Sequence, residues 1–151
     1  MSISLSNLIG NGPLFTASAL GTQTVSNNTN TLIRFPTVIT DTNNNYNSTT
    51  FAFLPTIEGY YQINSSIQFS FSSSTGGVGK SFLYQNGLLL RYGSGSAGST
   101  ATFTTIDSVS SNLVYMNGVS DYLQIYGVAA SVSGTNTISY GVFEAFLARP
   151  I

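Results

Sequence analysis

The sequence has no cysteine, no histidine and no tryptophan. Without cysteine there is no disulfide framework, so the redox compartment cannot be inferred. Without cysteine and histidine there is no thiolate nucleophile, no imidazole base and no zinc site of the usual ligand types. The few carboxylates show no close acid/base pair of the kind that glycosidases use. The sequence therefore predicts a protein that is not an enzyme and holds no cofactor.

Charge is also scarce. The chain has four Lys and Arg against five Asp and Glu, so only 6% of its residues are charged and its formal net charge is −1; ordinary soluble domains have about 25%. Nucleic-acid binding is not expected, because there is no basic field to hold a phosphate backbone. No membrane segment is expected either, because no run of about 18–20 apolar residues occurs. The N-terminus lacks the basic segment of a secretory signal, so either another release route or a removed signal is expected.

What the chain does contain is 42% hydrophobic residues, with nine Tyr and ten Phe among its 151 residues. Disordered chains lack such residues, and this length suits one domain. Polarity comes from Ser, Thr, Asn and Gly, which favour turns and exposed strand faces, whereas the helix formers Glu, Lys and Arg are nearly absent. We therefore expect an all-β fold of eight to ten strands without significant helix.

Two regions are expected along the chain. Residues 1–13 end in the turn signal Asn11-Gly12-Pro13 and form an N-terminal arm, either a flexible leader or an attachment segment. Residues 14–151 form the domain, in which strand-like runs alternate with turn clusters. The expected strands are 14–20, 31–39 with Pro36 at an edge or bend, 51–54, 59–71, 81–85, 88–92, 101–109, 112–116, 122–128 and 139–148.

Two of these strand predictions depend on clear patterns. Between Gly59 and Phe71, apolar residues share one parity and polar residues the other, which indicates a long strand with one buried face. Asn86-Gly87 stands between two strand-like runs and predicts a type I′ hairpin turn, which requires positive φ at both positions.

Several short motifs follow one another in an order found in one family. They are Phe35, the Asp41–Asn45 loop with Tyr46, Phe53, Pro55, Gly59-Tyr60-Tyr61-Gln62-Ile63, Phe82-Leu83-Tyr84-Gln85-Asn86-Gly87, Asn117-Gly118-Val119-Ser120-Asp121-Tyr122-Leu123 and Phe143-Glu144-Ala145-Phe146-Leu147. Over residues 15–151 the chain resembles the globular domain of complement C1q, in the tumour necrosis factor (TNF)-like jelly-roll group. The resemblance implies a two-sheet antiparallel jelly roll of ten strands that assembles as a tight trimer. The chain departs from the family in lacking a collagen-like stalk.

The resemblance predicts a subunit interface, and so do strands that carry bulky side chains on both faces. In residues 122–128 both parities carry bulky side chains, and a soluble monomer rarely exposes a large apolar patch. Tyrosine suits interfaces because it combines apolar area with a polar tip. The resemblance places the strands of Tyr60 and Tyr122 on the sheet that packs about the threefold axis. The predicted interface residues are Tyr60, Gln62, Tyr122, Gln124, Tyr126, Phe143 and Leu147.

Three loops are candidates for ligand binding, since loops on a rigid sandwich often carry function. The alternative is that they are plain connections. The candidate residues, suited to polar glycans, are Asp41, Asn43, Asn44, Asn45, Ser74, Lys80, Ser94 and Ser96. Calcium is the one metal considered, with the Asp41–Asn45 loop, Asp107 and Asp121 as oxygen donors, although no EF-hand run is present. Gly79-Lys80-Ser81 does not make a phosphate loop, because Ser74 stands where the first glycine is required.

Taken together, these features predict a trimeric structural protein of a virion, such as a head fibre, spike or tail-fibre knob of a phage. Its partners would be its own copies, other virion proteins through the arm, and a host surface glycan or protein. Its expected location is the virion surface. The alternatives are a bacterial cell-surface or spore-coat trimer, and a secreted monomeric carbohydrate-binding module located outside the cell.

Overall fold

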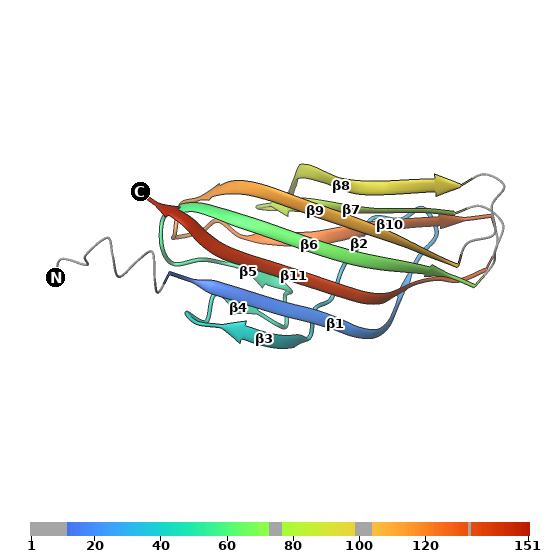
Figure 1. The fold of residues 1–151 in the computed structure, drawn as a ribbon, viewed down its shortest axis with the longest axis horizontal. Helices are drawn as coiled ribbons and strands as arrows, with labels where there is room; N and C mark the ends of the chain where they lie inside the picture. Colours follow the sequence, from blue (N-terminus) through green and yellow to red (C-terminus); the bar gives the residue numbers. More distant parts are fainter. Residues whose placement is uncertain (1–11, 73–76, 99–103, 133) are drawn as a thin grey trace.

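A computed structural model describes residues 12–72, 77–98, 104–132 and 134–151. Within these residues the chain forms eleven strands and no helix (Figure 1), so none of it is a helix long and apolar enough to cross a membrane. The strands are β1 (Leu14–Val25), β2 (Thr31–Leu32), β3 (Thr37–Asp41), β4 (Tyr46–Asn47), β5 (Ala52–Phe53), β6 (Gly59–Phe71), β7 (Gly77–Gln85), β8 (Leu88–Gly98), β9 (Thr105–Met116), β10 (Leu123–Ser131) and β11 (Asn136–Pro150).

The strands build two sheets that face each other (Figure 1). The five-stranded sheet has the order β3-β1-β11-β6-β9, and the six-stranded sheet has the order β4-β5-β10-β7-β8, with β2 pairing to β10. Neighbouring strands pair antiparallel throughout, for example β6 with both β9 and β11. The predicted all-β, two-sheet antiparallel sandwich is confirmed.

Strand β6 shows how alternation builds the core. Its bounds are those predicted, and its odd-numbered residues from Tyr61 to Phe71 are buried while the even-numbered ones are not. The buried Tyr61 ring meets the edge of Phe53 of β5 with centroids 5.7 Å apart, and Phe53 in turn stacks on Phe15 of β1 at 5.3 Å. Burying one such ring stabilises the fold by about 1.5–3 kcal/mol.

Residues 31–39 do not form the single strand that was predicted. β2 pairs with β10 in the six-stranded sheet, whereas β3 pairs with β1 in the five-stranded sheet. Pro36 lies between them and has no N–H for a ladder, so the chain changes sheets there. The buried side chains of Ile33 and Phe35 fill the space beneath this crossing.

Strand β9 is also longer than predicted. Residues 101–109 and 112–116 were expected as two strands, but β9 runs unbroken from Thr105 to Met116, and residues 101–103 lie outside the described part. Ser110 and Ser111 do not end the strand because they pair with Ser65 and Asn64 of β6. Serine pairs across a ladder are compatible with strand geometry.

The Asn86-Gly87 hairpin between β7 and β8 is confirmed. Asn86 has φ 54° and Gly87 has φ 79°, as a type I′ turn requires. The Asn86 side chain also ties the turn to the next connection: its Nδ2 donates to Asp121 Oδ1 at 2.8 Å, and its Oδ1 accepts the Tyr122 N–H at 2.9 Å.

The two ends of the sandwich differ. The chain enters β1 beside the place where it leaves β11, because Leu14 pairs with Phe146 (Figure 1). At the opposite end, β6 ends and β7 begins, β8 ends and β9 begins, and β10 ends and β11 begins. The described chain therefore enters and leaves at one end, which also carries the Asn86-Gly87 turn.

Candidate functional site: the outer face of the five-stranded sheet

The outer face of the five-stranded sheet carries exposed apolar side chains. They come from four neighbouring strands, and each exposes between 39% and 57% of its surface. They are Leu14 on β1, Tyr140 and Phe146 on β11, Tyr60 on β6, and Val109, Leu113 and Tyr115 on β9. Single exposed apolar residues are ordinary, whereas a contiguous patch of them marks an interaction site.

The strand register places these residues in rows. The row across β1, β11, β6 and β9 is Leu14, Phe146, Gln62 and Leu113. Beside it Tyr60 pairs with Tyr115, with ring centroids 5.7 Å apart. These two rows give the sheet end near the chain termini an apolar and aromatic surface.

A polar row lies next to the apolar one. Gln62 Nε2 donates to Asn64 Oδ1 at 3.1 Å and to Ser111 Oγ at 2.9 Å, and Ser111 Oγ donates to Asn64 Oδ1 at 3.0 Å. Glu144 lies beside Asn64, is half-buried, and has no hydrogen-bond or ion-pair partner among the described residues. A shallow hollow of about 430 Å³ at this point is lined by Asn64, Ser66, Val109, Ser111, Val142 and Glu144, among others.

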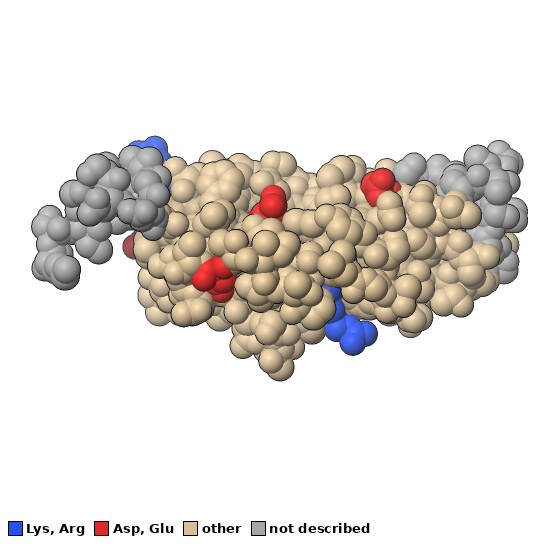
Figure 2. Space-filling model, turned by 60° about the horizontal axis from the view of Figure 1, so that its bottom comes forward, with Lys and Arg blue, Asp and Glu red and all other residues tan. Residues whose placement is uncertain are grey.

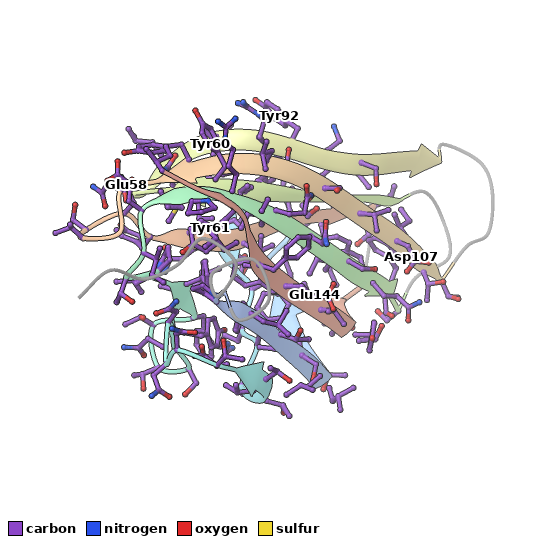
Figure 3. All side chains as sticks on the ribbon, turned by 60° about the vertical axis from the view of Figure 1, so that its left-hand side comes forward. Glu58, Tyr60, Tyr61, Tyr92, Asp107 and Glu144 are labelled. Carbon is purple, nitrogen blue, oxygen red and sulfur yellow. The ribbon has the colours of Figure 1, made fainter. Side chains whose placement is uncertain are left out.

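Carboxylates mark the two ends of the face (Figure 3). Near one end Tyr115 Oη donates to Glu58 Oε1 at 2.6 Å, and this hydrogen bond is the main cause that raises the pKa of the Tyr115 phenol. At the other end Gln68 Nε2 donates to Asp107 Oδ1 at 3.1 Å. Both carboxylates are thus hydrogen-bonded, in contrast to Glu144 between them.

The predicted interface is only partly brought together. Tyr60 and Gln62 lie on the outer face of the five-stranded sheet. Gln124 and Tyr126 lie on β10 in the six-stranded sheet, and Tyr122 directly precedes that strand. The prediction that these residues share one sheet is wrong, because β10 pairs with β7 and not with β6.

The assignment of Phe143 and Leu147 to an interface is wrong as well. Phe143 is 0% exposed and packs against Phe15 and Phe35 in the chain's own core. Leu147 has the same parity and packs against that core. The outward residue of this strand segment is Phe146.

Sequence reasoning missed Phe146, Leu113, Tyr115 and Tyr140. On β11 apolar bulk occurs at both parities, so periodicity does not choose between Phe143 and Phe146. On β9 the expected break after residue 109 hid the alternation that places Val109, Leu113 and Tyr115 on one face. Reading residues 105–116 as one strand would have exposed this signal.

The Asp41–Asn45 loop uses its polar groups internally. The Asp41 carboxylate accepts the N–H groups of Asn45 and Tyr46 at 2.9 and 2.8 Å. Asn43 Oδ1 accepts from Thr42 at 2.8 Å, Asn44 adopts φ 53°, and Asn45 is buried. This loop therefore has a structural reason for its composition, and its role in binding stays a prediction.

Two of the remaining loop candidates lie on neighbouring strands. Lys80 is exposed on β7 and pairs with Gly95 of β8, the residue that follows Ser94. Ser94 Oγ accepts the Val109 N–H of β9 at 2.8 Å. Ser74 lies outside the described residues, as does the side chain of Ser96, whose backbone belongs to β8. A role of these residues in binding stays a prediction.

The oxygen donors considered for calcium lie apart. Asp121 accepts hydrogen bonds from Asn86 Nδ2 and from the Asn117 N–H at 2.8 and 2.9 Å, while Asp107 binds Gln68 on another sheet. Within the described ranges, no three acidic residues come together as a metal site would need. Figure 2 likewise shows charged side chains scattered over the visible face. Calcium binding stays a prediction.

Two comparisons by sequence find nothing: no protein-family model and no curated protein matches the chain. Solved structures do match. The globular domain of zebrafish complement 1qA superposes with a TM-score of 0.63 at 14% identity, covering 92% of this chain and 98% of that one. The Eiger TNF of S. frugiperda superposes with a TM-score of 0.60 at 10% identity, covering 92% and 95%. The chain therefore has the jelly-roll fold of C1q- and TNF-like globular domains.

Proposed function

We propose that this chain is the subunit of a homotrimer that assembles through the outer face of its five-stranded sheet. The observation that carries the proposal is the patch of exposed apolar side chains on four adjacent strands, around Phe146 and Leu113. Such a patch is rare on a monomer, and buried interface cores are enriched in Tyr and Phe. Proteins with this fold are typically homotrimeric, which supports three copies rather than two.

The trimer would serve as a display module without catalytic activity. The chain enters β1 and leaves β11 at one end of the sandwich, so attachment through residues 1–13 would leave the opposite end, where β6, β8 and β10 end, pointing away. Loops held by a rigid sandwich are suited to recognition. The finer proposal is a virion structural protein, such as a head fibre, spike or tail-fibre knob, that attaches to a host or decorates the capsid. It is supported by the Ser-, Thr- and Asn-rich, charge-poor composition.

The experiment that tests assembly is the native mass of the purified protein, measured by light scattering and native mass spectrometry. Three chains of 16.0 kDa give a trimer of 48 kDa. We expect this mass down to micromolar concentration. A stable 16.0 kDa monomer would contradict the proposal.

A pair of variants tests which face assembles. Leu113→Asp places a charge in the apolar patch, on the edge strand β9, and should convert the trimer into a folded monomer, because burying an unpaired carboxylate is costly. Leu88→Asp is the matched control, since Leu88 is 75% exposed at the start of β8 on the other sheet. If Leu88→Asp also split the trimer, or if Leu113→Asp did not, the face would be assigned wrongly.

A further inference from the structure

The outer face of the six-stranded sheet carries a contiguous aromatic strip. Tyr126 on β10 pairs with Phe82 on β7, and Phe82 pairs with Tyr92 on β8, so three rings span three neighbouring strands. Tyr84 joins them: its ring centroid lies 4.4 Å from that of Tyr126, and the Phe82 and Tyr92 centroids lie 5.6 Å apart, with ring planes at 77°. Tyr92 is 72% exposed and projects from the β8 side (Figure 3).

The polar tips of this aromatic strip are free for a ligand. Tyr84 Oη accepts a hydrogen bond from Asn30 Nδ2 at 2.6 Å, which leaves its hydroxyl hydrogen available. Among the residues that the structure describes, the hydroxyls of Tyr92 and Tyr126 have no hydrogen-bond partner. The strip thus offers apolar ring faces together with hydroxyl donors and acceptors at their edges.

Its charge has one sign. Lys80 and Arg91 are the charged residues of β2, β4, β5, β7, β8 and β10, and these strands contain no Asp or Glu. Arg91 pairs with buried Leu83, so it follows the opposite parity to Tyr92 and leaves Lys80 as the charge of this face. Lys80 alternates with buried Ser81 and Leu83 and therefore lies on the same side of β7 as Phe82 and Tyr84. A ligand of this face therefore meets positive charge beside the rings, which favours an anionic partner.

We propose that this aromatic strip binds a polysaccharide that carries carboxylate groups. A pyranose ring has an apolar C–H face that packs on an aromatic ring, and its equatorial hydroxyls reach groups at the ring edges. Sugar carboxylates would pair with Lys80. The chain's lack of a basic field makes a nucleic acid the weaker occupant, since phosphate backbones need many cations. A second copy docking face to face would bring like charges together.

The inference does not depend on the proposed trimer. If the copies meet through the five-stranded sheet, the strips stay on the outside, and three of them on one particle would bind a long polymer by avidity. A monomer would bind the same polymer more weakly. Binding and native mass are therefore measured on the same samples, so that failure of the trimer and failure of this site are told apart.

The test uses the full chain in native gels that contain polygalacturonate, alginate or hyaluronan, with neutral galactan and a poly-dT oligonucleotide as comparison ligands. We expect retardation by at least one of the three acidic polysaccharides and none by galactan. Tyr92→Ala should raise the dissociation constant about tenfold, a loss comparable to removal of one stacking ring. Val119→Ala is the control, since Val119 is 90% exposed in the connection before β10 and belongs to neither outer face, and it should bind as the unchanged chain does.

Lys80→Gln tests the charge separately, with Arg149→Gln, at the end of β11, as its control. Lys80→Gln should weaken binding at low salt and flatten the salt dependence, because screening acts on this ion pair. Unretarded migration in all three acidic polysaccharides would overturn the proposal. So would equal retardation by galactan, equal binding of poly-dT, or an equal loss in Tyr92→Ala and Val119→Ala.

Discussion

The two sheets bury their inner faces by the same rule but leave very different outer faces. The five-stranded sheet exposes Leu113, Phe146 and tyrosines, with the carboxylates of Asp107 and Glu144 beside them. The six-stranded sheet exposes a strip of rings with Lys80 and Arg91 and no carboxylate. The alternation of apolar and polar residues along each strand therefore explains the fold. The side chains on the outer faces differ: those of the five-stranded sheet suit contact with other copies of the chain, and those of the six-stranded sheet suit a ligand.

The largest effect is expected from two phenylalanines on β11 that face opposite ways. Phe143→Ala should lower the free energy of unfolding by about 3–5 kcal/mol, because it removes a ring from a packed core. Phe146→Ala should leave the unfolding of the monomer nearly unchanged and weaken the trimer. Urea denaturation measures the stability of both variants, and sedimentation velocity measures their assembly. If Phe146→Ala destabilised the fold and Phe143→Ala weakened only the trimer, the assignment of Phe143 to the core and of Phe146 to the outer face would be wrong.

A smaller loss is expected where the two sheets are joined by a buried polar pair. Ser81 Oγ of β7 and Ser108 Oγ of β9 lie 2.7 Å apart, and Ser108 Oγ also accepts the Ser81 N–H at 2.9 Å. Ser108→Ala leaves that buried N–H unpaired, so we expect a loss of about 1–3 kcal/mol in the free energy of unfolding. Ser111→Ala, on the exposed side of the same strand, should change it by less than about 0.5 kcal/mol. If thermal unfolding showed that the two variants lose equal stability, the hydrogen bonds of Ser108 between the sheets would not contribute more than those of an exposed serine.

Glu144 should oppose the assembly that its neighbours favour. Its carboxylate has no partner among the described residues of its own chain, so a trimer must bury it or pair it. Glu144→Gln should therefore tighten the trimer about tenfold, equivalent to about 1.4 kcal/mol.

Sedimentation equilibrium of Glu144→Gln and of the unchanged chain measures this effect, with Asp107→Asn as the matched control. Asp107 belongs to the same face but is hydrogen-bonded to Gln68 at its end. A weaker trimer in Glu144→Gln would instead indicate an ion pair with a basic residue of a neighbouring copy.

The smallest effect concerns adjacent tyrosines on the two faces of β6. Burial raises the pKa of Tyr61 from 10.0 to about 12, and its Oη donates to the Ile57 carbonyl at 2.8 Å. A raised pKa favours the protonated phenol in the folded state, so this stabilisation is complete below pH 10 and is lost as the pH rises toward 12. Tyr61→Phe should flatten the fall in urea midpoint between pH 9 and pH 11. Tyr60→Phe, on the exposed face, should leave that slope unchanged.

The sequence predicted the parts of the fold that depend on local pattern. The alternation of β6 and the Asn86-Gly87 turn follow from residues close in the chain, and both are confirmed. The change of sheet at Pro36 was missed because a proline in a strand-like run indicates an edge or a bend, and only tertiary pairing decides which sheet each half joins.

The candidate site was harder to predict, because an outer face is defined by strands that are distant in sequence. Tyr60 was placed correctly from its own strand, but its neighbours Tyr115 and Phe146 come from β9 and β11. Tyr126 was grouped with Tyr60 on the strength of residue type and resemblance, and only the pairing of β10 with β7 separates them. Residue type thus indicated exposed aromatic surfaces, and strand order was needed to assign them to two different faces.

The separation of charge between the sheets has a consequence for the colloidal behaviour of the protein. The composition gives an isoelectric point near 4.9, so the free chain should bind an anion exchanger at neutral pH. A trimer closed over Asp107 and Glu144 would withdraw acid groups from the solvent and keep Lys80 and Arg91 at its periphery. Such a particle would approach a negatively charged cell envelope as if it were basic, although every chain in it is acidic.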